Sequence, residues 1–436
     1  MKISGKRILT VLAAGLFFLC TALPAAALTV DFHGKALTGA MGASDGWILG
    51  DRNNDNDSTT FAAGKFRFRA EVGTDDGRAK MVYGFETGAN NFGDSESWDY
   101  SGDSTDFENR FAYIQLNVPG MNDQVMGRAG LQKTGVNHWV WTETAAGVTL
   151  HGNGAVNWSA GWFRGLEEGF GAPEDDVAET DFYMIKGDFK PGDNITVGGF
   201  ALYGEDFGAK SAVGDLGWEE IEDGADQYWV GLTGKIDGPV FASGDLIYQG
   251  GDAGNDGNLD VSAWLANLTV GARVSDNAKV SVHGLYVTGD DDPLDGDLDA
   301  FQSVDADVKV GQIFFKDSLA ASLDRFVDDQ FGATMPEPLR NKGLMTLALE
   351  GEIQLDAKNN LRGAVRYLET AEKYASANFS DEDELGYEFD LWYAYKYNDN
   401  LTLKLEGAYL ISGDLAEEMF DDDDVYQVAA GMVFAF

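Results

Sequence analysis

Few side chains in this sequence are arranged for chemistry. The histidines belong to no paired zinc spacing such as H-E-x-x-H, and neither a nucleophile-elbow motif nor a Walker-type phosphate loop occurs. Two acidic runs, 51–57 and 252–257, resemble calcium loops, but Ala62 and Ala263 stand where the glutamate at position twelve is required. We therefore predict no catalytic residue, no cofactor and no dedicated metal centre, and we do not expect an enzyme.

Basic side chains instead recur at every second position. In segments 61–74 and 77–89 they alternate with apolar residues, so the two kinds of side chain lie on opposite faces of extended chain. The same alternation recurs near 128 and in 361–367. The residues that we expect to line an interior wall are Lys65, Arg67, Arg69, Lys80, Arg128, Arg362 and Arg366.

A second candidate set lies in the segment 131–144, which is less acidic than the other polar segments. Its members are Lys133, His138, Trp139, Trp141 and Glu143. Two tryptophans would be unfavourable in an exposed loop tip. We therefore expect this segment to fold inward, where it would either line a constriction or pack against the inner wall as a structural plug.

These residues must be positioned by strands. Between 401 and 411, Leu401, Leu403 and Leu405 alternate with Thr402 and Lys404, which is the period of a half-buried strand. Segment 387–397 has the same period, and only Asn398-Asp399-Asn400 separates the two. This composition predicts a β-hairpin.

The hairpin unit recurs along the chain, with short turns alternating with longer acidic loops. We expect short turns near 75–77, 119–123, 152–154, 190–193, 237–239, 275–277, 356–359 and 398–400. Long loops are expected at 42–60, 90–106, 165–179, 205–225, 290–340, 371–384 and 414–424. Such alternation is typical of an antiparallel up-and-down transmembrane β-barrel, with turns on one side of the membrane and loops on the other. The fold class is therefore all-β, with about 18 strands, or 16 if the ambiguous parts near 145–164 and 300–340 are not paired.

A soluble β-sandwich also alternates apolar and polar residues, but a chain of this length would need several sandwich domains. The last strand also favours the barrel, because it places Val428, Met432, Phe434 and the terminal Phe436 on one face. An aromatic C-terminal strand is typical of outer-membrane barrels and predicts a contact with the barrel assembly machinery. We therefore expect an outer-membrane location, with membrane lipid and lipopolysaccharide as partners.

The N-terminal residues and the net charge indicate where the protein is sent and which partners it can have. Lys2, Lys6 and Arg7 precede an apolar run and the small residues Ala25–Ala27, so residues 1–27 read as a cleaved signal peptide that carries Cys20 with it. Residues 28–436 would then form one barrel domain. The net charge of −42 makes nucleic acid an implausible partner, and the acidic loops could bind divalent cations.

The run 108–135 (ENRFAYIQLNVPGMNDQVMGRAGLQKTG) resembles the fourth and fifth strands and following loop of the homotrimeric outer-membrane porins of sulfate-reducing, Desulfovibrio-like bacteria. The resemblance extends to 146–150, 162–164 and the terminal strands. It implies a trimer of barrels, each with its own pore for small solutes.

These observations predict a water-filled channel for passive diffusion. The interior arginines predict a weak preference for anions, against the acidic outer loops. Two other functions stay open: a substrate-specific channel in which Trp139 and Trp141 stack a sugar or aromatic solute, and a surface adhesin that binds through its loops.

Overall fold

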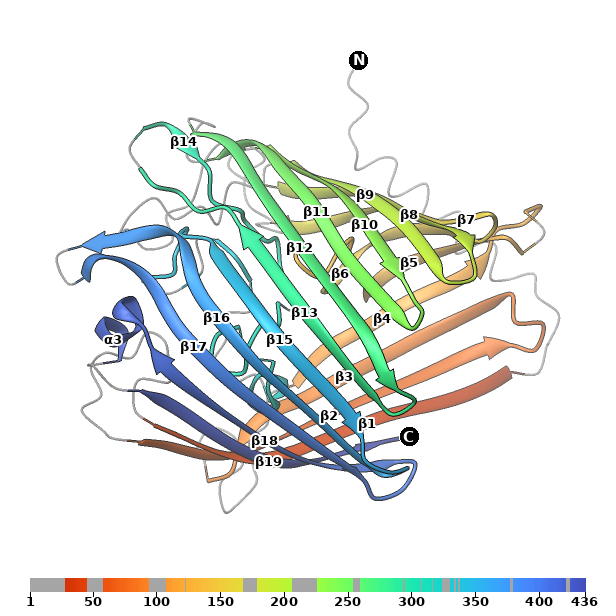
Figure 1. Cartoon of the computed structure of the whole chain (residues 1–436). Helices are drawn as coiled ribbons and strands as arrows, with labels where there is room; N and C mark the ends of the chain where they lie inside the picture. The colour runs from red at the N-terminus through yellow and green to blue at the C-terminus, as the bar shows by residue number, and fades with distance from the viewer. Residues whose placement is uncertain are drawn as a thin grey trace.

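The computed structural model describes residues 28–44, 58–93, 107–121, 123–167, 179–205, 226–253, 259–292, 295–306, 308–315, 317–323, 330–332, 335, 338–376, 379–420 and 424–436. The predicted signal peptide, 1–27, and most of the loops predicted at 42–60, 90–106, 165–179 and 205–225 lie outside these residues. The described part of the chain forms one antiparallel barrel of long strands (Figure 1).

The strands are β1 (Leu28–Ser44), β2 (Ser58–Thr74), β3 (Ala79–Asn91), β4 (Phe107–Asn117), β5 (Val125–Lys133), β6 (Thr144–Gly152), β7 (Val156–Glu167), β8 (Glu179–Gly192), β9 (Ile195–Glu205), β10 (Gln227–Ile236), β11 (Val240–Ala253), β12 (Leu259–Ser275), β13 (Ala278–Val287), β14 (Asp297–Leu298), β15 (Leu344–Gln354), β16 (Asn359–Ser376), β17 (Phe379–Lys396), β18 (Leu401–Ser412) and β19 (Val425–Ala435). Within the described residues, two short helices accompany them, α2 (Leu319–Ser322) and α3 (Asp414–Met419).

The barrel closes where β1 pairs with both β2 and β19, so that Lys35 lies opposite Ala435. Each long strand of the wall is antiparallel to its neighbours in the wall, and β13 pairs directly with β15. The two-residue β14 pairs in parallel with β12 at the rim. Apart from β14, eighteen strands of the described chain form the wall, which confirms the all-β barrel and the higher of the two expected strand numbers. Closure matters because a free sheet edge in lipid would leave backbone groups unpaired.

The hairpin turns gather at one end of the barrel, and β14 and α3 lie at the opposite end (Figure 1). One long loop was predicted wrongly. Residues 371–384 belong mostly to β16 and β17, which continue past the barrel rim as a paired ribbon in which Tyr374 lies opposite Glu382. The acidic composition of this stretch indicated a loop, but a ribbon in water accepts charged residues on both faces.

The outer surface of the wall carries exposed apolar side chains at every second position, for example Leu232, Leu268 and Leu347. Tyrosine and tryptophan form a belt toward the end that carries α3. Within this belt the rings of Tyr248 and Trp264 lie 4.8 Å apart. An apolar band flanked by aromatic side chains is the surface of a barrel that spans a membrane. Among the described residues, no helix has the length and apolar character needed to cross a bilayer.

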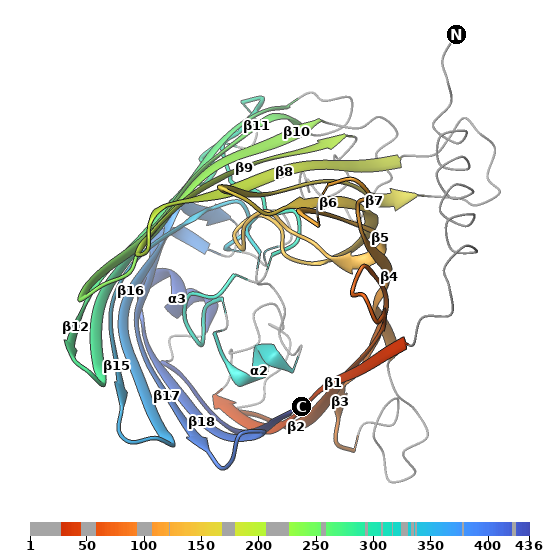
Figure 2. The ribbon, with the colours of Figure 1, turned by 90° about the vertical axis from the view of Figure 1, so that its right-hand side faces the viewer.

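The inside of the barrel is not empty. A segment between β14 and β15, described over 299–306, 308–315 and 317–323, runs through the lumen and carries α2 (Figure 2). Its apolar side chains are buried and pack with apolar residues of the inner wall, and Phe301, Phe314 and Leu319 are at most 1% exposed. The prediction of an external loop over 290–340 is therefore wrong for this part. The acids at both ends of the stretch hid the alternating apolar residues Val304 to Val310 between them.

Candidate functional site in the lumen

The inner face of the first strands carries a group of basic side chains. The side chain of Glu86 on β3 is only 1% exposed, and its carboxylate accepts hydrogen bonds from three of these basic side chains. Lys65 donates from 2.9 Å, Arg110 donates from 3.2 Å, and Arg67 donates through Nε. One buried carboxylate thus holds three cations, and the basic charge exceeds the acidic charge at this point of the wall.

A second ion pair lies closer to the end with the short turns. Glu71 on β2 lies 3.0 Å from Arg69 and 2.7 Å from Lys80. Both cations remain about one-third exposed. The alternation therefore places Lys65, Arg67, Arg69 and Lys80 on the inner face, but carboxylates on the same face pair with them.

Arg128 on β5 is held by neutral groups. Its Nε donates to Gln115 at 3.0 Å, and its guanidinium lies 5.5 Å from the centre of the Tyr113 ring. Within the described part of the chain its partners are these two neutral side chains, and no ion pair to a carboxylate is formed. Arg128 is therefore a partly buried positive charge on the inner wall without an opposing charge beside it.

Arg362 and Arg366 on β16 also face inward. Arg362 stacks on the ring of Trp392 at 3.7 Å and pairs with Asp317 of the lumenal segment. Arg366 is 1% exposed and donates to Asp390 at 2.9 Å. Arg366 is thus covered by protein instead of facing water in the lumen.

The loop between β5 and β6 folds inward. Trp139 and Trp141 are 3% and 4% exposed. Asp245 of β11 fixes the loop, because Trp139 Nε1 donates to it at 3.2 Å and Asn137 at 2.9 Å. Trp141 packs edge-on against Phe163 of β7. Both tryptophans therefore pack against the wall, leaving little of either ring exposed for stacking a solute.

The other predicted members of this loop lie elsewhere on it. His138 stays accessible beside Trp139, and desolvation by the surrounding protein lowers its pKa against the charge of Asp245, so it is neutral at pH 7. Glu143 accepts from the backbone of Thr144 at the base of the loop. Lys133 is exposed at the end of β5, on the outward side that it shares with Leu131.

The lumenal segment docks on this loop. The backbone of Val304 donates to Val140 at 2.8 Å, and Thr142 donates to the carbonyl of Asp305 at 2.9 Å. Ser303 donates its hydroxyl hydrogen to the carbonyl of Trp139. The two inward elements therefore form one continuous body inside the barrel.

Several residues of this site were missed by sequence reasoning. Asp245, Glu388, Asp390 and Glu406 face inward from β11, β17 and β18 and bind the inward elements. Their alternation with outward apolar residues is visible in the sequence. Nothing in the spacing distinguishes an acid that binds a loop from one that faces water.

A polar pocket of about 270 Å³ opens between the lumenal segment and β15–β18. Its lining includes Lys309 and Asp317 of the segment and Arg362, Trp392 and Lys404 of the wall. Charges of both signs and one aromatic face thus meet in a space large enough for a small solute. Within the part of the chain that the structure describes, no cluster of three or more histidine, cysteine or acidic side chains could hold a metal ion.

No known family model matches the sequence, and no curated protein matches it. The fold, by contrast, has counterparts among solved structures. Over 93% of this chain, OpdL from Pseudomonas aeruginosa superposes with a TM-score of 0.54 at 10% identity, and a BenF-like porin from Pseudomonas fluorescens Pf-5 with a TM-score of 0.55 at 11% identity. OccK2 (OpdF) from Pseudomonas aeruginosa, solved in complex with glucuronate, gives a TM-score of 0.54 at 12% identity. In each case 98% of the other chain is covered. The chain therefore shares the fold of outer-membrane porins.

Proposed function

We propose that this protein is an outer-membrane channel through which small hydrophilic solutes diffuse passively. One observation carries the proposal: a closed barrel with an apolar outer band carries groups of charged side chains on its inner face, on the first strands and on β15–β18. Barrels of 16–18 strands are wide enough to leave an aqueous channel. Here the two inward elements narrow it.

A weak preference for anions belongs to the same proposal. Arg128 lies on the inner wall beside neutral groups, and the cluster around Glu86 contains three cations for one carboxylate. The external acids that would oppose this preference act through water and are screened within about 10 Å at 0.1 M salt.

A substrate-specific channel is the second candidate, and the pocket between Arg362, Lys309 and Lys404 favours it. A planar guanidinium stacked on an indole offers a ready surface for a small polar solute. The likeness to OccK2, solved with glucuronate, makes sugar acids a sensible first probe. The adhesin alternative depends on loops that lie largely outside the described residues.

Several proposals accompany the channel: a signal peptide over 1–27, recognition of the strand ending at Phe436 by the assembly machinery, contacts of the acidic loops with lipopolysaccharide and divalent cations, and a homotrimer. The trimer rests on the resemblance of 108–135 to trimeric porins.

Purified protein in a planar bilayer under a salt gradient tests the proposal. We expect stepwise ohmic currents, grouped in threes for a trimer, with a reversal potential that indicates anion preference. Block of the current by glucuronate would favour the specific channel. Absence of current from correctly folded protein would contradict both channel functions.

A further inference from the structure

The inner wall of β15–β18 has a different charge from the wall of the first strands. Glu388, Asp390 and Glu406 face inward there, and each is at most 5% exposed. Carboxylates are costly to bury unless hydrogen bonds satisfy them. The part of the chain that covers these three carboxylates must therefore provide hydrogen-bond donors.

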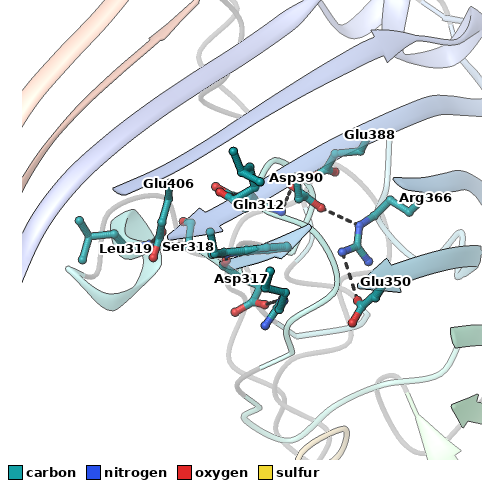
Figure 3. A network of polar contacts seen from close by, with 12 residues as sticks. Gln312, Asp317, Ser318, Leu319, Glu350, Arg366, Glu388, Asp390 and Glu406 are labelled. Atoms are coloured by element: carbon teal, nitrogen blue, oxygen red, sulfur yellow. Dashed lines mark hydrogen bonds and ion pairs between the residues drawn. The ribbon is translucent and has the colours of Figure 1, made fainter. Parts of the chain in front are cut away.

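The lumenal segment provides these donors from its backbone (Figure 3). The N–H of Ile313 donates to Glu388 at 2.9 Å, and that of Gln312 donates to Asp390 at 3.3 Å. The N–H of Leu319, at the start of α2, donates to Glu406. Three wall carboxylates thus bind the backbone N–H groups of Gln312, Ile313 and Leu319, and none of these contacts uses a side chain of the segment.

Glycines on both the lumenal segment and the wall allow the two to approach each other closely. A Cβ at Gly311 would lie 2.5 Å from the carboxylate oxygens of Glu388, so a larger residue would separate the segment from the wall. Gly39 and Gly431, paired across the β1–β19 seam, leave room for the side chain of Leu319. Glycines on the segment and on the wall therefore allow the contact.

We propose that this contact, which we name the carboxylate latch (Glu388, Asp390 and Glu406 with residues 311–319), sets both the width and the charge preference of the channel. The inference rests on the proposed channel function. The latched segment occupies lumen volume, and it covers a part of the wall where the three carboxylates outnumber the buried Arg366. The accessible wall is then the basic side that carries Arg67, Arg69 and Arg128. Release of the latch widens the channel and exposes carboxylates.

Gly311→Ala tests the latch without changing any charge. The added methyl group can be accommodated only if the segment moves or if Glu388 turns away from Ile313, and either change breaks the latch. We expect single-channel conductance to rise by about twofold or more, because a wider water-filled lumen conducts better. We also expect the reversal potential to shift toward cations. Gly351→Ala, at an outward glycine with open space around it, is the matched control and should behave as wild type.

Glu388→Gln gives a second test, in which the side chain keeps its shape and no heavy atom is added. It should raise the conductance as well, with a smaller shift toward cations because one carboxylate is lost. Asp399→Asn, in the exposed turn of the same half of the barrel, controls for loss of a negative charge.

Thiol labelling provides a readout that does not depend on current. Ser318 is 6% exposed, so Ser318→Cys should react slowly with a charged thiol reagent and at least about tenfold faster when combined with Gly311→Ala or Glu388→Gln. Heat-dependent gel migration identifies folded barrels.

The possible outcomes are distinct. No current from folded wild type overturns the channel function itself. Wild-type current together with unchanged conductance, reversal potential and labelling in both latch variants overturns the latch. If Gly311→Ala does not fold, the Glu388→Gln results decide.

Discussion

Carboxylates of the barrel wall hold both inward elements, but the groups that donate hydrogen bonds to these carboxylates differ between the two. In the loop between β5 and β6, the side chains of Asn137 and Trp139 donate to Asp245. In the lumenal segment, backbone N–H groups donate to Glu388, Asp390 and Glu406. The loop could be predicted because its donors are distinctive side chains, whereas a backbone donor leaves no trace in the sequence. The two elements should also affect the charge preference of the channel to different degrees, because the segment covers three carboxylates and the loop covers one.

The largest effect should follow from removing the segment from the lumen. Replacement of residues 308–323 by a short glycine-serine linker exposes the acidic wall, so we expect the reversal potential to change from anion to cation preference. Conductance should rise severalfold, since barrels of this strand number enclose an aqueous channel when unobstructed. Bilayer recording in a salt gradient measures both quantities, and an unchanged sign of the reversal potential would show that the segment does not control the charge of the lumen.

Release of the loop should have a smaller and different effect. Asp245→Ala leaves the donors of Asn137, Trp139 and Asn267 unpaired, at a cost of about 1–3 kcal/mol for an unsatisfied buried group. We expect a lower thermal midpoint and a noisier current. Because the variant removes a carboxylate from the lumen, the reversal potential should not shift toward cation preference. Asp237→Asn in an exposed turn is the control. A cation shift as large as that of the segment variant would remove the distinction between the two elements.

Charge on the two elements can be compared directly. Lys309 lies exposed in the lumenal pocket, whereas desolvation by the surrounding protein lowers the pKa of His138 on the loop, which favours its neutral form. Lys309→Gln should therefore shift the reversal potential toward cations, and His138→Gln should not. Recording at pH 7 checks the pair. Equal shifts from both variants would show that His138 is charged and that the field in the lumen differs from the one described.

The smallest expected effect is a pH dependence of stability that arises at the barrel rim, near the start of the lumenal segment. Burial raises the pKa of Asp290 to about 6, and the charge of Lys342 only partly opposes this. A carboxyl with a higher pKa in the folded than in the unfolded chain destabilises the fold when both are ionised. The contribution of Asp290 to the thermal midpoint should therefore rise as the pH falls from about 7 toward about 4.

Asp290→Asn isolates this contribution. The variant should be more stable than wild type at pH 7, and the two midpoints should converge near pH 4. A constant difference between wild type and variant across this range would rule out the titration of Asp290 as its cause.

The wall of the barrel could be predicted from the sequence, and its contents only in part. Period two in segments such as 401–411 identifies strands because lipid and water impose opposite requirements on alternate side chains. The same rule placed Arg67 and Arg366 on the inner face, but it could not show that Arg366 is covered by protein. Burial inside the lumen depends on which connection folds inward. For residues 299–323 that choice depends on contacts with strands far away in the sequence, from Gly39 of β1, against which Leu319 packs, to Gln427 of β19, which binds Gln312.

Exclusion of neutral polymers from the single channel tests the central claim most directly, namely that an open barrel is narrowed from within. Polymers of increasing size are added while the conductance of wild type and of the 308–323 replacement is recorded. We predict that small polymers lower the conductance of both proteins, and that intermediate sizes enter only the replacement. An identical size limit for the two proteins would contradict the account.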